Sequence, residues 1–168
     1  MAYNFSAEDV FEMAVRIEEN GAAFYRKAAE LQADEDDKSF LNMLAEMEDR
    51  HKISFEDMKE QLSKQETAKT VFDPNDEMGL YLNAMADAHG GEGDPDVLEL
   101  LTGQETMADI IETAIGLEKK SILFYVGIED LVPEKLGHDK IDMIIKEEKK
   151  HIAQLTGYLK KAEKIDAK

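Results

Sequence analysis

The chain has 168 residues, 43% of them hydrophobic, so it is long enough to bury a substantial core. Its net charge of -18 argues against binding to nucleic acid or to anionic membrane surfaces. The absence of cysteine excludes disulfides, thiolate zinc sites, iron–sulfur clusters and cysteine nucleophiles.

Two helices are predicted in the first part of the chain. Apolar residues recur every three or four positions up to about residue 33, and again from about 37 to 63, which is the period of a helix. The acidic residues 34–37 interrupt this pattern and predict a turn with the cap of the second helix. Glu18 lies on the apolar stripe of the first helix and Glu48 beside that of the second, so both are candidates for burial.

The middle of the chain, residues 64–105, has weaker periodicity. A turn signal around Pro74 precedes a predicted short helix over about 76–88, which is followed by a glycine-rich loop. This stretch is too long for a hairpin connection and too sparse in apolar residues for a domain of its own. We interpret it as a long crossover.

Two more helices are predicted at about 106–131 and 138–163, separated by a turn that contains Pro133. No strand pattern competes with the helical ones. The prediction is therefore an all-α protein with a single domain over residues 1–168. Its antiparallel four-helix bundle consists of one hairpin at 6–63 and another at 106–164, joined by the crossover at 64–105.

The two hairpins are copies of one pattern. The motif Glu48-x-x-His51 recurs as Glu148-x-x-His151, at an offset of 100 residues. The same offset aligns further pairs without a gap: Glu18 with Glu118, Phe24 with Phe124, and Tyr25 with Tyr125. With only two copies and so long a period, the chain is a duplicated hairpin rather than a repeat array.

The spacing brings the repeated residues to one level of the bundle. Residues equidistant from a hairpin turn stand side by side on antiparallel helices, and the midpoint of Glu18 and His51 falls in the first predicted turn. The midpoint of Glu118 and His151 falls in the second turn. Glutamate and histidine three residues apart share one face of a helix. Two hairpins packed face to face would therefore gather all six side chains.

Four buried carboxylates repel one another, and two divalent cations would offset their charge. Carboxylates with one imidazole per metal suit iron or manganese, and zinc also accepts such ligands. A lone Glu-x-x-His motif is more often a coincidence on an acidic surface, but a duplicated one in register with Glu18 and Glu118 favours a dinuclear metal site. Tyr25 and Tyr125 either hydrogen-bond a carboxylate of this site or serve as core aromatics.

This set of residues resembles that of the ferritin-like di-iron carboxylate proteins and, among them, the rubrerythrin branch. The segments Ile17-Glu18-x5-Phe24-Tyr25 and Leu117-Glu118-x5-Phe124-Tyr125 resemble rubrerythrin helices as well. The resemblance implies a ferritin-like bundle with two iron ions. It assigns bridging roles to Glu48 and Glu148, terminal roles to Glu18 and Glu118, and one iron each to His51 and His151.

The resemblance implies a di-iron oxidoreductase that reduces hydrogen peroxide or dioxygen, and commonly a homodimer. Rubrerythrins usually carry a cysteine-containing rubredoxin domain, so here the electrons would come from a separate donor such as a rubredoxin. Many also have an extra glutamate where this chain has Ser121, whose repeat mate is Gly21. That difference keeps open a ferroxidase or an iron-binding or iron-storage protein without a peroxidase cycle. A helical interaction protein that keeps its ligands for stability is a third alternative.

Neither a membrane span nor a signal peptide is predicted. The chain has no run of about 18 apolar residues, and its N-terminus lacks the basic and apolar regions of a leader. We therefore expect a cytoplasmic protein.

Overall fold

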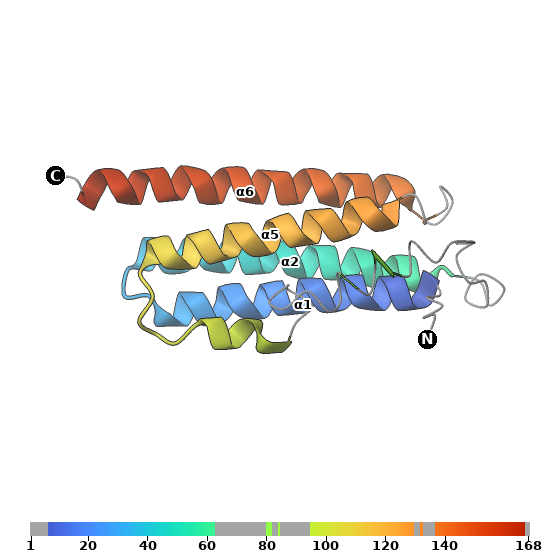
Figure 1. The fold of residues 1–168 in the computed structure, drawn as a ribbon, viewed down its shortest axis with the longest axis horizontal. Helices are drawn as coiled ribbons and strands as arrows, with labels where there is room; N and C mark the ends of the chain where they lie inside the picture. Colours follow the sequence, from blue (N-terminus) through green and yellow to red (C-terminus); the bar gives the residue numbers. More distant parts are fainter. Residues whose placement is uncertain are drawn as a thin grey trace.

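The computed structural model describes residues 7–62, 80–81, 84, 95–129, 132 and 137–166. Four long helices lie side by side, with a short 3-10 helix along the outside of the first (Figure 1). The elements are α1 (Ala7–Leu31), α2 (Glu35–Glu60), η1 (Pro95–Leu100), α5 (Met107–Glu129) and α6 (His138–Asp166). All-helical architecture is thus confirmed, and no strand occurs among the described residues.

The ends of the four long helices lie within three residues of those predicted from the sequence. Helix α2 begins earlier than expected, because its cap is Asp34, the first of the four acidic residues. The Asp34 carboxylate accepts hydrogen bonds from the backbone N–H groups of Asp36 and Asp37. The acidic residues that follow the cap also match the positive end of the helix dipole. The predicted short helix at 76–88 falls mostly outside the described residues.

Local signals also define where α5 and α6 begin. At α5, Thr106 Oγ1 accepts from the Asp109 N–H, and the Asp109 carboxylate accepts from the Thr106 N–H, which makes a reciprocal capping box. At α6, Gly137 has a φ of 108°, a conformation that favours glycine. A Cβ at that residue would lie only 2.9 Å from Met58 Sδ, so the turn also packs closely on α2.

Two apolar clusters fill the interior at opposite ends of the bundle. The first cluster joins the beginning of α1 to the end of α2, the end of α5 and the beginning of α6, and contains Phe11, Phe55, Phe124 and Ile141. The second joins the opposite ends of these helices, with Val97 of η1, and contains Phe24, Leu44, Ile111 and Leu155. The middle of the bundle, between the clusters, is where the repeated polar residues lie.

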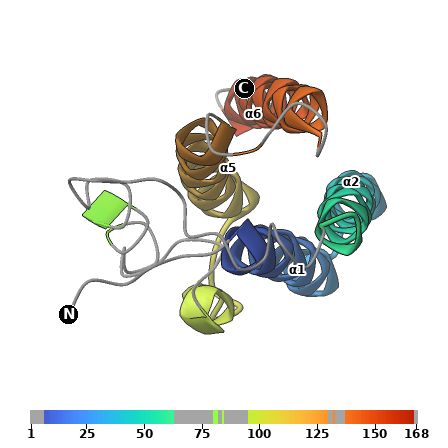
Figure 2. The ribbon, with the colours of Figure 1, turned by 90° about the vertical axis from the view of Figure 1, so that its right-hand side faces the viewer.

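Specific contacts hold the two hairpins together. The Tyr158 hydroxyl of α6 donates to the Asp37 carboxylate of α2, and its ring stacks on Phe40 at a centroid distance of 4.3 Å. Seen along their axes, the four helices surround a common central region, with η1 outside α1 (Figure 2). Lys27 of α1 binds η1 by donating a hydrogen bond to the Leu98 carbonyl at 2.6 Å.

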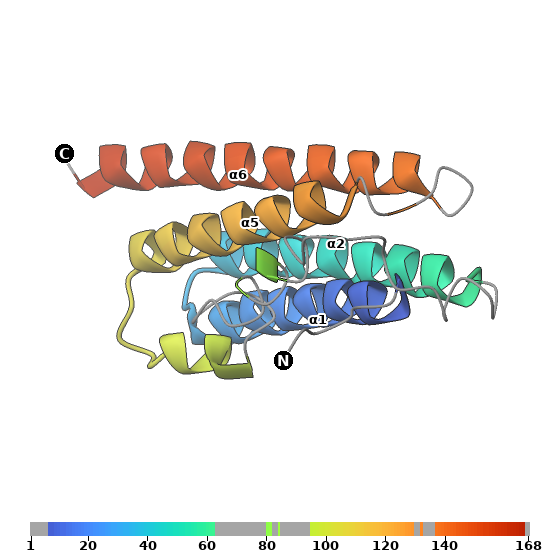
Figure 3. The same ribbon diagram turned by 45° about the vertical axis from the view of Figure 1, so that its right-hand side comes forward.

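The loop from η1 to α5 lies at the end of the bundle where α1 turns into α2 (Figure 3). The second hairpin therefore starts beside the turn of the first. This arrangement places the two Glu-x-x-His motifs, on α2 and α6, at the same level. Among the described helices, none is both long and apolar enough to cross a lipid bilayer.

Candidate metal centre

Each of the four long helices contributes to a buried polar cluster at mid-bundle. The cluster comprises Glu18 from α1, Glu48 and His51 from α2, Glu118 from α5, and Glu148 and His151 from α6. None of these six residues is more than 2% exposed. The structure therefore brings together all six residues that the sequence singled out.

The six residues form two overlapping groups. One consists of Glu18, Glu48, His51 and Glu148, and the other of Glu48, Glu118, Glu148 and His151. Within each group, the candidate ligand atoms all lie within 4.8 Å of one another. Glu48 and Glu148 belong to both groups, so each of these carboxylates stands between the two halves of the cluster.

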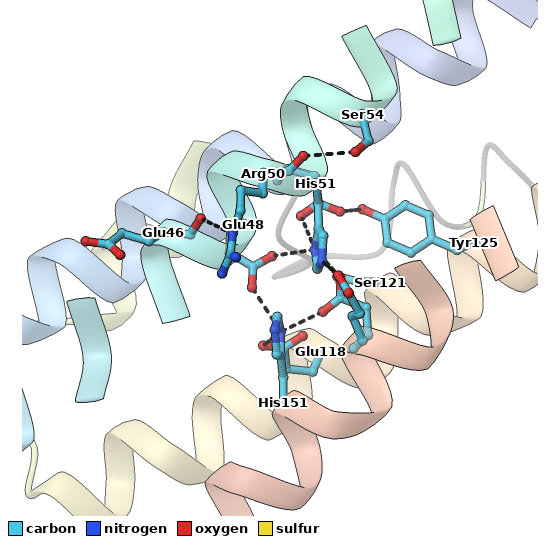
Figure 4. A network of polar contacts seen from close by, with 12 residues as sticks. Glu46, Glu48, Arg50, His51, Ser54, Glu118, Ser121, Tyr125 and His151 are labelled. Atoms are coloured by element: carbon cyan, nitrogen blue, oxygen red, sulfur yellow. Dashed lines mark hydrogen bonds and ion pairs between the residues drawn. The ribbon is translucent and has the colours of Figure 1, made fainter. Parts of the chain in front are cut away.

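Both imidazoles point their Nδ1 atoms at the carboxylates (Figure 4). His51 Nδ1 lies 2.7 Å from Glu148 Oε1 and 3.4 Å from Glu18 Oε2. His151 Nδ1 lies 2.9 Å from Glu148 Oε2 and 3.1 Å from Glu48 Oε1. The rings themselves are 5.5 Å apart between centroids and nearly parallel. Two halves of like composition thus meet across the middle of the bundle.

The short distances in this cluster lack the geometry of well-formed hydrogen bonds. Several inward-facing atoms are buried without a hydrogen-bond partner in the described part of the chain: Glu18 Oε2, Glu48 Oε1, both Glu148 carboxylate oxygens, His51 Nδ1 and His151 Nδ1. Buried polar atoms in folded proteins are nearly always satisfied. Oxygen and nitrogen atoms that converge in this way, without well-formed hydrogen bonds, fit a bound cation, so the donor set suits a pair of metal ions.

In the metal-free protein, burial and the neighbouring charged groups shift the pKa values of Glu18 and Glu148. Burial, followed by repulsion from Glu48 and Glu148, raises the pKa of Glu18 well above its ordinary value. Burial acts against charge on Glu148 too, but its contacts with His151 and His51 outweigh this and lower its pKa. Without metal, the negative charge of the carboxylates is thus offset by protons bound within the cluster.

The imidazoles hold those protons. Burial opposes charge on His151, but contacts with Glu118, Glu148 and Glu48 outweigh it and raise its pKa to about 12. The pKa of His51 is likewise raised by Glu148, Glu18 and Glu48 against the effect of burial. Protons therefore occupy the cluster at neutral pH in the metal-free protein.

Comparison with solved structures gives one informative match. The chain is similar to a candidate ferritin-like diiron-carboxylate protein from Thermotoga maritima, with a TM-score of 0.74 and 25% sequence identity. The match covers 96% of this chain and 99% of the other. The fold is ferritin-like. No family model and no curated protein matches the chain.

The tyrosines of this ferritin-like bundle bind across the two hairpins. Tyr125 of α5 donates to Glu18 Oε1, and Tyr25 of α1 donates to Glu118 Oε1. Each tyrosine thus holds the glutamate of the opposite hairpin rather than the one on its own helix. In the case of Glu18, the bond engages Oε1 and leaves Oε2 facing the cluster.

Glu147 also contacts the cluster, although it was not predicted from the sequence. Its Oε2 lies 2.8 Å from His51 Nε2, on the outer side of the ring. Glu147 does not belong to the repeated pattern, because its repeat mate is Met47. A carboxylate adjacent to a predicted ligand on the same helix was the available signal.

Ser121, which stands where many rubrerythrins have an extra glutamate, is buried and donates to the Leu117 carbonyl of its own helix at 3.3 Å. It therefore brings no carboxylate to the cluster.

Binding of divalent metal is expected to release protons, up to three for a fully loaded chain. Metal must displace the protons of His51, His151 and Glu18, whose pKa values are raised in the metal-free protein. The apparent affinity should accordingly fall as the pH is lowered from 8 to 6. Calorimetric titration in buffers of different ionisation enthalpy measures the number of protons released.

The stability of the metal-free protein should change with pH in the opposite direction. A histidine whose pKa is raised on folding stabilises the fold fully below its ordinary value of 6.5, and this contribution is lost as the pH rises toward about 12. The gap in melting temperature between metal-loaded and metal-free protein should therefore widen from pH 6 to pH 8. A constant gap with no proton release would contradict the assignment of these groups.

Proposed function

We propose that the six clustered residues bind two iron ions in a carboxylate-bridged pair. The observation that carries this proposal is the sharing of Glu48 and Glu148 between two groups, each completed by one further glutamate and one histidine. A shared carboxylate with an oxygen for each side is the arrangement that a bridged pair requires. The burial of all six side chains supports it, since uncompensated carboxylates in that position would be costly.

The donor set is compatible with iron, manganese and zinc. Carboxylate oxygens with one imidazole per metal suit iron and manganese, and zinc tolerates the same ligands. The similarity to a candidate diiron-carboxylate protein supports iron. Manganese and zinc are therefore substitutes to be tested beside it.

The proposed reaction is the reduction of hydrogen peroxide, or of dioxygen. Two bound ferrous ions would supply the two electrons that, with two protons, convert one hydrogen peroxide into two waters. Reduction of the centre for the next cycle requires a separate electron donor such as a rubredoxin, because the chain has no cysteine with which to build one of its own.

The protein's own side chains would prepare the site for this reaction. Tyr125 and Tyr25 hold the outer glutamates by donated hydrogen bonds, which fixes their carboxylates before metal arrives. The apolar clusters at both ends of the bundle exclude water along the helix axis.

The test is rapid mixing of anaerobically iron-loaded protein with hydrogen peroxide and, separately, with dioxygen, followed by visible absorption. Fast oxidation by peroxide at one peroxide per two irons supports the peroxidase reaction. Slow oxidation by both oxidants would contradict it. A much faster reaction with dioxygen would favour an oxidase or a ferroxidase.

A ferroxidase or iron-storage role is the second candidate, and Ser121 is the observation in its favour. Without an extra glutamate at that position, the two halves of the centre are nearly symmetric, as in simpler ferritin-like proteins. Storage needs a hollow assembly of many chains, whereas rubrerythrin-like enzymes are commonly dimers. Light scattering of the purified protein distinguishes these, and a homodimer would argue against storage.

A further inference from the structure

The outer nitrogens of the two imidazoles have different surroundings. His51 Nε2 lies 2.8 Å from the Glu147 carboxylate. Because His51 Nδ1 faces the cluster, it is the nitrogen that would bind a metal; Nε2 would then carry the ring's proton and donate it to Glu147. His151 Nε2 is also buried, but it has no hydrogen-bond partner among the residues that the structure describes.

This difference corresponds to one position at which the two repeats differ in sequence. In the repeat, Glu147 corresponds to Met47 on α2, one residue before Glu48. A methionine thioether carries no charge and accepts hydrogen bonds only weakly. The missing partner of His151 is thus a substitution at one position and not a chance orientation of a side chain.

The two halves otherwise match closely. Each has a Glu-x-x-His motif, an outer glutamate held by a tyrosine of the opposite hairpin, and a share in both central carboxylates. Glu147 is half-exposed, at 39%, while the ring it contacts is buried, so the carboxylate reaches the imidazole from the edge of the bundle. Its contact with His51 is therefore a feature that distinguishes the halves.

A carboxylate on the outer nitrogen of a metal-binding histidine has known physical effects. It fixes the tautomer and the orientation of the ring, and it makes the other nitrogen a stronger donor to metal. The His51 ring is therefore already oriented when a cation binds. His151 must be oriented by the metal itself, which costs part of the binding energy.

We propose that Glu147 is a positioning residue that makes the two metal sites unequal. The half that contains His51 takes the first divalent cation, and the half that contains His151 takes the second, with an affinity roughly 10–100-fold weaker. This inference rests on the proposed function, because it concerns the same six ligands.

The test is an anaerobic titration of the metal-free full-length protein with cobalt(II), whose visible bands report its ligand environment, alongside calorimetry. Wild type should bind two ions in two resolved steps. Glu147→Ala should weaken the first step by roughly 10–100-fold and bring the two steps together. Glu147→Gln, whose amide oxygen can still accept from Nε2, should restore part of the loss.

The reciprocal variant should gain metal affinity. Met47→Glu should strengthen the second step, so that both ions bind with similar affinity. Glu46→Gln, an exposed change on the same helix, is the matched control and should leave both steps as in wild type. The metal-free melting temperatures of the Glu147 variants should stay within about 2 °C of wild type, which separates positioning from a general loss of stability.

The outcomes separate the inference from the function on which it rests. Failure of wild type to bind any metal would overturn the proposed function. Two ions bound with equal affinity, or two steps that Glu147→Ala leaves unchanged, would overturn the inference alone.

Discussion

Glu48→Ala and Glu148→Ala are each expected to lower the iron bound per chain from two ions to less than one. Each of these carboxylates belongs to both ligand groups, so its loss removes a ligand from both metals at once. Losing an outer glutamate such as Glu18 should instead affect one metal. Metal analysis after anaerobic loading and desalting measures the difference.

Control variants make this first result interpretable. Glu46→Ala removes an exposed carboxylate from the same helix and should retain two ions. Glu48→Gln keeps the side-chain volume, which guards against loss of metal through misfolding, and circular dichroism verifies the helices. One ion retained by Glu48→Ala would show that Glu48 does not bridge, and a wild type without metal would remove the basis of the site altogether.

Loading with iron is expected to raise the melting temperature by about 15–30 °C. A ligand present at 1,000 times its dissociation constant stabilises the folded state by about 4 kcal/mol per site, and each kcal/mol raises the melting temperature of a chain this size by about 2–4 °C. The metal also relieves the repulsion among Glu18, Glu48 and Glu148. Calorimetric scans of metal-free and loaded protein measure the shift.

The double variant Glu48→Gln with Glu148→Gln is the comparison for this second result. It removes the shared ligands while keeping the packing, so added iron should hardly change its melting temperature. A large stabilisation by iron in the double variant would place the metal elsewhere.

The fold was largely predictable because its signals are local. Helical periodicity, the acidic cap at Asp34 and the turn before α6 are each contained in a few adjacent residues, and the duplicated motif fixed the register of the hairpins. The placement of Glu18, Glu48 and His51 at one level followed from counting to the turn. These features depend on the chain alone and not on how the hairpins pack.

The contacts between hairpins were not predictable in this way. That Tyr25 holds Glu118, and Tyr125 holds Glu18, depends on the rotation of each helix about its axis, which apolar spacing defines only coarsely. The contact of Glu147 with His51 was missed for a related reason. Repeat symmetry identifies what the halves share, whereas Glu147 is where they differ.

The exchange of side chains between hairpins has a consequence for how such a protein can arise. One hairpin alone holds half of a centre, since each outer glutamate takes its tyrosine from the other hairpin and each ligand group takes a carboxylate from it. Two copies of one short ancestral hairpin, associated face to face, would supply every ligand. Such a pair must be identical at every position. Fusion into one chain lets the copies diverge, and Met47 opposite Glu147 in the repeat is a difference that a pair of identical hairpins cannot have.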